Sequence, residues 1–297
     1  MDINASSLRS IYTGLSTAFN GRFGSVASFY NTVAMTVNST GAQNEYPRLD
    51  DLKGIREWVG ERIYNRLGGS SFVIKNKRFE ETITINRDNI ADDQLGIYFN
   101  VAAQMGQNAA EFPDRLIFPL LKNGENAVCY DGQYFFDIDH PGFDANGADT
   151  VVSNFTSGAY PAWYLMDDSQ VLKPIIYQTR EAFGIVARQN PDDPRVFDYN
   201  EYTWGSTGRM NAGYGAWQTI YKSKADLNAA NYEAARVKLA SQYKRSGEPL
   251  NIAGKVLLVP PALEGAARKL IINERNDAGA TNVWKDTARI VVIPHLA

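Results

Sequence analysis

The stretch RFEETITINRDNIADDQLGIYFNVAAQMGQNAAEFPDRLIFPLL, residues 78–121, joins a β-like run to the longest helical pattern of the chain. Asp88 is an available N-cap for that helix, and Pro113 is expected to end or kink it before the apolar pattern resumes at Leu116. The apolar residues before the proline recur at helical spacing: Leu95, Tyr98, Phe99, Ala102, Met105 and Ala109. A helix of this length is expected to form the central element of a subdomain.

The segment before this stretch contains another β-like run, FVIK at 72–75. A polar turn around Asn76-Lys77 separates it from FEETITIN, so the two runs predict a β-hairpin. Further upstream, residues 55–67 place apolar side chains on one helical face, and Gly68-Gly69 supplies a stop. We expect one short helix there.

The N-terminal residues predict an amphipathic helix that needs another element to lie on. Apolar side chains recur at helical spacing over residues 4–19, and Asn4 is an available N-cap. Gly21 and Gly24 are expected to break the pattern. A short apolar run at 33–37 and a longer polar run follow. We therefore expect the N-terminal region to form an arm rather than a domain.

The second half of the chain is richer in strands than the first half. Residues 144–160 predict an exposed loop, because Gly, Asp, Asn and Ser are frequent there. Helices are predicted at 226–245 and after Pro260-Pro261. Candidate strands lie at 163–166, 174–178, 183–188, 196–204, 216–221, 255–259 and 288–293. This order of elements predicts an α+β fold rather than a regular βαβ winding.

Length and composition limit the classes of function. The 297 residues, 44% of them hydrophobic, suffice for one large core or two smaller ones, and we expect two intimate subdomains. The formal net charge of −3 argues against dedicated nucleic-acid binding. Cys129 is the single cysteine, which excludes an intrachain disulfide and a four-thiolate metal site. The sequence has no apolar run of about 18 residues and no signal-peptide pattern, so we expect neither membrane spanning nor export.

The segment FDIDHP, residues 136–141, is the best local candidate for a metal site or an acid–base pair. Asp137, Asp139 and His140 offer three ligands, but on a strand the two carboxylates would share a face and the imidazole would point away. We favour a structural turn that ends at Pro141, with the Asp side chains bonded to the backbone. A metal-dependent hydrolase centred on this cluster is the alternative function.

The remaining polar groups also have a chemical and a structural interpretation. Asp88 with Asp92-Asp93 could bind a cation, but acidic residues in a first helical turn also complement the helix dipole. Asp192-Asp193, between two prolines, fits a turn. Cys129 is expected to pack rather than to act as a nucleophile. We favour the structural interpretation in each case.

Two further groups are formed by glycines and by cations. The stretch GSTGRMNAGYGAW, residues 205–217, matches no phosphate-binding motif, so we favour a subunit contact or a tight strand bend. The cations are interspersed with Glu57, Glu61, Glu80 and Glu81, which favours salt bridges or solvation over DNA binding. They are Arg62, Arg66, Lys75, Lys77 and Arg78. We assign no catalytic, cofactor-binding or metal-binding residue.

Several strings, in order over nearly the whole chain, together resemble the Mu-like bacteriophage major head subunit (T protein) family, a family of major capsid proteins. They are FNGRF at 19–23, GIREWVGERI at 54–63, RFEETITINRDNIADDQLGIY at 78–98, CYDGQYFFDIDHP at 129–141, WYLMDDSQVLKPIIYQ at 163–178, NAGYGAWQTIY at 211–221, LLVPPALEGAARKLI at 257–271 and TNVWKDTARIVVIPHLA at 281–297. Each string is weak alone, and their shared order makes the resemblance specific.

The resemblance implies the tailed-phage capsid fold of the Hong Kong 97 type. On that basis residues 1–30 form an N-terminal arm, and 31–87 form an extended hairpin loop and the start of a peripheral domain. Residues 88–129 form the spine helix of that domain, 130–280 form an axial domain, and 281–297 form a C-terminal strand that returns to the core. The implied function is self-assembly into pentamers and hexamers of an icosahedral phage shell around double-stranded DNA, not catalysis.

The resemblance also implies partners and a location. These are other copies of the chain, a separate scaffold protein, a maturation protease, a portal and a decoration protein, with packaged DNA met only non-specifically and no membrane. The chain would be made in the bacterial host cytoplasm and end in the virion. Lys75 and Lys77 are candidates for a lysine-to-asparagine cross-link, but no residue stands out as the acceptor.

A carbohydrate- or peptide-binding module is the third class of function. Tyr and Trp side chains between 199 and 221 could line a surface for such a ligand. A monomer that stays ordered at high concentration would favour this module over a shell subunit.

Overall fold

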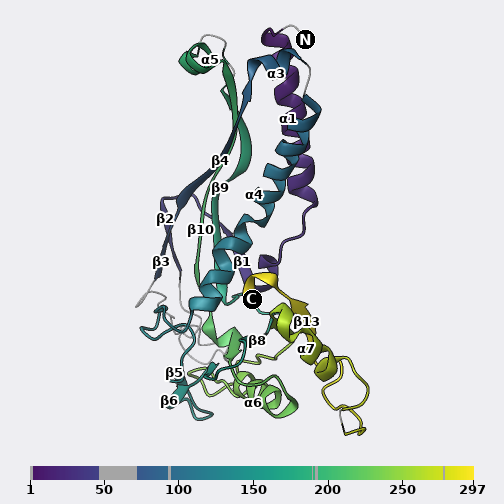
Figure 1. Cartoon of the computed structure of the whole chain (residues 1–297). Helices are drawn as coiled ribbons and strands as arrows, with labels where there is room; N and C mark the ends of the chain where they lie inside the picture. The colour runs from purple at the N-terminus through teal and green to yellow at the C-terminus, as the bar shows by residue number, and fades with distance from the viewer. Residues whose placement is uncertain (1–2, 47–71, 93–94, 189, 191–192, 277) are drawn as a thin grey trace.

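The computed structural model describes residues 3–46, 72–92, 95–188, 190, 193–276 and 278–297. The molecule has an elongated part, in which two long helices lie along a four-stranded sheet, and a second part below it that holds a five-stranded sheet and two shorter helices (Figure 1). The helix expected at 55–67 and its Gly68-Gly69 stop fall outside the described residues. None of the helices in the described ranges is long and apolar enough to cross a membrane.

The first helix, α1 (Ala5–Ser25), begins as expected but continues further than predicted. The side chain of Asn4 accepts hydrogen bonds from the backbone N–H groups of Ser6 and Ser7. Gly21 and Gly24 do not end the helix, because a glycine costs only about 1 kcal/mol in a helix and packing outweighs this cost. The buried side chains of α1 recur every three or four residues: Leu8, Ile11, Leu15 and Phe19.

The long helical stretch is divided into α3 (Arg87–Ala91) and α4 (Leu95–Asn123). Asn86, not Asp88, caps α3, since its side chain accepts the N–H of Asp88. Pro113 and Pro119 both lie inside α4, so the helix does not end at Pro113, which was one of the two outcomes expected there. Contacts along α4 with α1 and the sheet outweigh a proline cost of about 3 kcal/mol.

Helices α1 and α4 approach each other closely. A Cβ built on Gly106 of α4 would lie 2.3 Å from the carbonyl oxygen of Phe19 in α1. Any larger residue at this position would therefore force the helices apart. Both helices cover the inner face of the sheet, where Ile85, Tyr202 and Trp204 are buried.

The sheet of the elongated part has the strand order β1-β9-β10-β4. Strand β1 (Ala34–Asn38) runs parallel to the start of β9, whereas β10 is antiparallel to both β9 and β4. The other strands are β4 (Lys77–Asn86), β9 (Ile175–Arg188) and β10 (Glu201–Tyr214). The glycine-rich stretch that was expected to bend a strand contributes Gly205, Gly208 and Gly213 to β10, with a register irregularity near Thr207 and Arg209.

The predicted hairpin between residues 72–75 and 79–86 is wrong. Strand β3 (Phe72–Lys75) pairs with β2 (Gln43–Tyr46), and β4 pairs with β10. Only Asn76 separates β3 from β4, and hairpin loops need at least two residues to reverse the chain. The chain therefore passes from one sheet to another at this residue.

Three predicted strand boundaries also differ from the structure. The runs at 174–178 and 183–188 belong to one strand, β9. The run at 196–204 is divided between α5 (Pro194–Tyr199) and β10, because the Asp193 side chain caps the helix and Asn200 ends it with a φ of 55°. The run at 216–221 is divided between η1 (Trp217–Thr219) and β11 (Ile220–Ser223).

The second part is built on a sheet of order β13-β12-β8-β11-β7. Its strands are β7 (Phe155–Thr156), β8 (Trp163–Met166), β11 (Ile220–Ser223), β12 (Val256–Val259) and β13 (Arg289–Val292). The end of α4 packs on one face, and α6 (Ala229–Ala240) and α7 (Glu264–Ile271) pack on the other. Burial of both faces explains the continuous apolar runs of β8 and β12.

The shorter elements lie around these two sheets. They are α2 (Tyr30–Val33), the two-stranded sheet of β5 (His140–Phe143) and β6 (Asp149–Val152), and the short turns η2 (Pro261–Leu263) and η3 (Pro294–Leu296). Residues 144–160, predicted as an exposed loop, therefore include β6 and β7.

Side chains of β8, β10 and β11 cap the end of α4. The last carbonyl groups of a helix lack partners within the helix, and three of these in α4 accept side-chain donors. Tyr214 Oη donates to the carbonyl of Leu120 (2.9 Å), Tyr164 Oη to that of Leu121 (3.4 Å) and Lys222 Nζ to that of Lys122 (2.9 Å). These bonds fix the direction of α4 relative to the five-stranded sheet.

Candidate assembly elements and side-chain clusters

A two-stranded limb leaves the elongated part of the molecule. It consists of β2 and β3, which pair antiparallel with Gln43 opposite Lys75 and Tyr46 opposite Phe72. At its base the N–H of Asn76 donates to the carbonyl oxygen of Ala42 at 3.0 Å. The limb forms a sheet of its own at the side of the molecule (Figure 1).

A buried polar cluster holds the limb base against β9. Gln178, which is fully buried, accepts a hydrogen bond from Tyr46 Oη at 2.8 Å. Its side-chain nitrogen donates to the Ile74 carbonyl (3.2 Å) and to Asn76 Oδ1 (2.8 Å). Asn76 in turn donates to Ser39 Oγ at 3.0 Å. The root of the limb is therefore fixed by side-chain bonds and not by a continuous sheet.

The segment after α1 is anchored on α4 by one carboxylate. Asp114 is buried and accepts the backbone N–H groups of Phe29 (3.1 Å) and Tyr30 (2.7 Å), so it caps the start of α2. Burial raises the pKa of Asp114, although both backbone N–H groups act in the opposite direction. Lys173 Nζ also donates to the Asn31 carbonyl. The chain from α1 to β1 is thus fixed at its midpoint.

The candidate cluster Asp137, Asp139 and His140 does not converge. Asp137 accepts the N–H groups of Tyr134 (3.2 Å) and Ile138 (2.8 Å), as the turn interpretation expects. Asp139 is exposed, and desolvation together with the neighbouring Asp137 carboxylate raises its pKa. His140 lies against Asp131 instead.

Asp131, which the sequence interpretation did not single out, is the partner of both His140 and Cys129. Its Oδ2 lies 2.8 Å from His140 Nδ1, and its Oδ1 accepts the thiol of Cys129 at 3.0 Å. Both carboxylate contacts are shielded from solvent, since the side chains of His140 and Asp131 are 0% and 1% exposed. Burial and the Asp131 carboxylate raise the pKa of the Cys129 thiol, so it is protonated and a poor nucleophile at neutral pH.

The other predicted clusters have structural roles where they are described. Asp88 lies in the first turn of α3, as the dipole interpretation expects. Asp193 caps α5 and pairs with Arg188 at 2.5 Å. Arg78 pairs with Glu181 of the same chain at 3.1 Å. Arg62, Arg66, Asp93 and Asp192 lie outside the described residues.

The aromatic residues between 199 and 221 do not form a ligand-binding surface. Tyr202, Trp204, Trp217 and Tyr221 are all buried in the two sheets. Tyr199 is 65% exposed, but it stands at the end of α5 without a second exposed Trp or Tyr from this stretch. The structure therefore gives no support to a carbohydrate-binding platform here.

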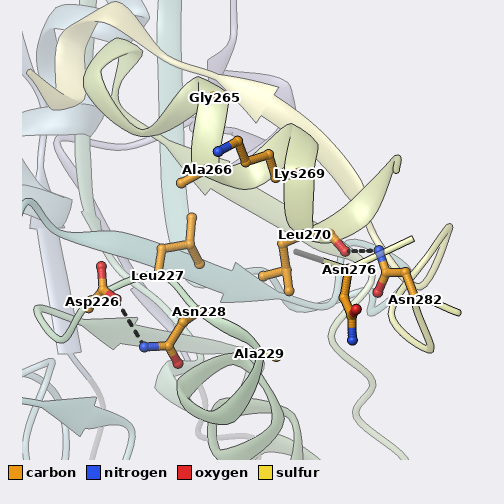
Figure 2. A pocket seen from close by; sticks show the side chains of 10 residues that line it. All are labelled: Asp226, Leu227, Asn228, Ala229, Gly265, Ala266, Lys269, Leu270, Asn276 and Asn282. Carbon is orange, nitrogen blue, oxygen red and sulfur yellow. Dashed lines mark hydrogen bonds between the residues drawn. The ribbon is translucent and has the colours of Figure 1, made fainter. Parts of the chain in front are cut away.

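An open groove lies between the start of α6 and α7, with a volume of about 530 Å³ (Figure 2). Leu227 and Leu270 line it, with Lys269 at its rim. Asp226 bonds to Asn228 at 3.0 Å, and Asn282 bonds to the Leu270 carbonyl at 2.9 Å. Its polar side chains thus brace the groove walls and do not converge on a common point.

A separate strand pair at the side of a helix–sheet body suits a subunit that makes contacts with other subunits, and the comparisons with known proteins agree. The sequence profile of the Mu-like prophage major head subunit gpT family matches residues 8–296. The chain belongs to this family. It is 37% identical over its full length to the major capsid protein of Escherichia phage Mu, whose full length is also covered.

Solved structures of phage heads show the same fold. The head subunit resembles a chain of the bacteriophage JBD30 procapsid with a TM-score of 0.88 and 35% identity, covering 99% of this chain and 100% of that one. It also resembles a chain of the JBD30 capsid decorated with minor capsid protein trimers, with a TM-score of 0.77, 26% identity and 92% of each chain covered.

These matches establish the fold and the class of function. The protein is a major capsid protein of a Mu-like phage with the tailed-phage, Hong Kong 97-type fold, and it is a structural component of the virion shell, not an enzyme. The hydrolase alternative gains no support from the family or from the arrangement of Asp137, Asp139 and His140. The sequence missed the limb-root residues, because Gln178 lies more than 100 residues from its partners Ile74 and Asn76.

Proposed function

We propose that this head subunit assembles into pentamers and hexamers that close an icosahedral shell around double-stranded DNA. The observation that supports this proposal is the limb of β2 and β3, which pairs only within itself among the described strands. Strand segments that project from a subunit leave backbone donors and acceptors and apolar surface for a neighbour to cover. Because the limb is a separate sheet at the side of the body, it can meet neighbours in slightly different environments.

We further propose the family's division of the chain. Residues 1–30 act as the arm, 31–87 as the extended loop and start of the peripheral domain, and 88–129 as the spine helix. Residues 130–280 act as the axial domain, with β9 and β10 extending along α4, and 281–297 return to the core through β13. The antiparallel pairing of β2 with β3 inside 31–87 and the parallel pairing of β13 with β12 support these limits.

The proposed partners are other copies of the chain, a separate scaffold protein, a maturation protease, a portal and a decoration protein. Decoration is supported by the JBD30 capsid, which carries minor capsid protein trimers. Contact with packaged DNA would be non-specific, as the net charge of −3 suggests. We propose synthesis in the host cytoplasm, which suits a chain whose single cysteine is a free thiol.

Removal of the limb tests the proposal. A deletion of residues 36–80 would cut into β1 and β4, so the structure indicates narrower limits. Ala42 and Asn76 are joined by a backbone hydrogen bond of 3.0 Å, and a Gly-Gly link can replace residues 43–75 between them. We expect this variant to fold with the helical circular dichroism signal of the parent and to remain unassembled in electron micrographs.

A substitution variant serves as the matched control for the deletion. Val128→Ser changes an exposed side chain close to the limb without shortening it, and shells should form at the parental yield. Normal closed shells from the limb-deleted variant would reject the proposed role of the limb. A parent chain that stays monomeric at high concentration would reject the assembly proposal itself.

A further inference from the structure

Three side chains that have no part in the proposed assembly converge just after the end of α4. They are Cys129, Asp131 and His140, and they form the single group of His, Cys and acidic residues in the described ranges whose ligand atoms all lie within 4.8 Å of one another. Thiolate, carboxylate and imidazole are the three ligand types that Zn²⁺ uses in proteins. We propose that these residues bind one zinc ion and thereby fasten the turn after α4 to β5.

The present distances are those of hydrogen bonds that a cation can replace. Cys129 Sγ lies 3.0 Å from Asp131 Oδ1, and His140 Nδ1 lies 2.8 Å from Asp131 Oδ2. A tetrahedral zinc ion with bonds of about 2.0–2.3 Å needs ligand atoms about 3.3–3.7 Å apart. A side-chain movement of about half an ångström would therefore admit the ion.

The change of bonds on zinc binding is simple. The Cys129 S–H bond breaks, its proton passes to solvent, and the sulfur electron pair forms the Zn–S bond. Asp131 supplies an oxygen. The proton that His140 Nδ1 shares with Asp131 in the metal-free site is lost to solvent while Nε2 takes one up, so the imidazole stays neutral and its Nδ1 lone pair binds the ion. Because a proton is released, zinc binding should weaken as the pH falls.

His140 is prepared for this role by its surroundings. Its ring is fully buried and stacks on Trp217 with centroids 3.9 Å apart and planes within 10°. Nε2 has no hydrogen-bond partner among the described residues, so no other contact fixes which nitrogen carries the proton. The cost of one unpaired N–H is small beside three metal–ligand bonds.

The site has an open side and a structural purpose. Cys129 lines a small pocket of about 270 Å³ that Tyr130 and Ile74 also line, so its thiol is the ligand that lies beside open space. The ion would link residues 129–131 to the first residue of β5, beside the joint where side chains cap α4. With a single cysteine, the chain cannot form an intrachain disulfide here.

Metal analysis of the full-length protein tests the proposal. The purified protein is incubated with excess Zn²⁺, desalted, and measured by elemental mass spectrometry at pH 7.5. We expect about one zinc per chain in the parent and at least a tenfold lower content in Cys129→Ala. His295→Gln, which alters the other, exposed histidine of the chain, is the matched control and should retain the full zinc content.

Titration of the parent with Co²⁺ provides a spectroscopic readout. Binding at the site should produce the near-ultraviolet charge-transfer band of a thiolate–cobalt bond, and Cys129→Ser should abolish it. Less than about one zinc per ten parent chains, equal zinc content in Cys129→Ala, or cobalt spectra without that band would each overturn the proposal. Particle images from the same preparations report separately on shell assembly.

Discussion

Lys222 is the buried charge on which the joint at the end of α4 depends. Its side chain is 2% exposed, and its Nζ lies 3.7 Å from Glu125 Oε1. Burial lowers the pKa of Lys222 to about 8, although Glu125 acts in the opposite direction. The folded chain therefore carries this charge at neutral pH at a cost in stability.

The pH dependence of this cost is the first prediction. Between about pH 8 and the ordinary lysine value of 10.5, the unfolded chain still holds the proton that the folded chain has released. The free energy of unfolding should therefore rise with pH through this window. Relative to Lys222→Met, the parent should gain about 2 kcal/mol between pH 8 and 9.5, measured by urea denaturation of unassembled subunits.

Lys224→Met is the matched control, because Lys224 lies 3.3 Å from the same Glu125 oxygen with its side chain 34% exposed. This control separates the effect of losing a cation beside Glu125 from the effect of losing a buried cation. A constant stability difference between the parent and Lys222→Met from pH 8 to 9.5 would contradict the burial of a charged amine.

Single residues also show which contacts can be predicted from the sequence. The turn interpretation of Asp137 is confirmed, since its carboxylate bonds to two nearby backbone N–H groups. The partnership of His140 with Asp131 was missed, although the two residues are only nine positions apart. Local hydrogen bonds can be inferred from residue type, whereas the direction of the His140 ring depends on Trp217, which lies in η1 much later in the chain.

At the scale of elements, the limb depends on Gln178. This side chain donates to the Ile74 carbonyl and to Asn76 Oδ1, and both acceptors lose that donor in Gln178→Leu. A buried polar group without a partner costs about 1–3 kcal/mol, so the limb root should open while the rest of the subunit stays folded. Hydrogen exchange of the β2 and β3 amides should accelerate at least about tenfold, and the yield of shells should fall.

Gln104, an exposed glutamine of α4, provides the comparison for Gln178→Leu. Gln104→Leu removes an exposed side chain that bonds only to Asn108 at 3.1 Å, and it should leave exchange in the limb unchanged. Unchanged exchange in Gln178→Leu as well would show that other contacts hold the limb root.

Elements with a clear apolar pattern were predictable, and those defined by distant partners were not. Helix α1 and strands β8 and β12 follow directly from apolar spacing and continuous apolar runs. The hairpin of 72–75 with 79–86 was wrong, because the partner of β3 lies more than 25 residues upstream of it, across the limb. The strand at 196–204 was wrong at its start, since Pro194 and the Asp193 cap favour a helical turn that apolar pattern alone does not reveal.

At the scale of the whole molecule, the subunit leaves surface that its own fold does not cover. Ile97 on α4, Val171 near β9 and Phe197 on α5 are 67%, 89% and 90% exposed, and they are spread over the length of the molecule. Scattered exposed apolar residues are normal in a monomer. A shell subunit that meets neighbours along both its limb and its body would cover many of them.

Thermal stability should therefore depend on assembly. A neighbour that binds only the folded chain stabilises it by mass action, by about 1.4 kcal/mol for each tenfold rise in concentration above the assembly threshold. For a chain of this size that corresponds to about 2–4 °C in Tm per tenfold step, measured by scanning calorimetry. The variant with residues 43–75 replaced by Gly-Gly should melt at one temperature at all concentrations, because it folds but cannot recruit neighbours. A parent Tm independent of concentration would mean that the folded subunit gains nothing from other copies, which is incompatible with a limb that contributes to shell stability.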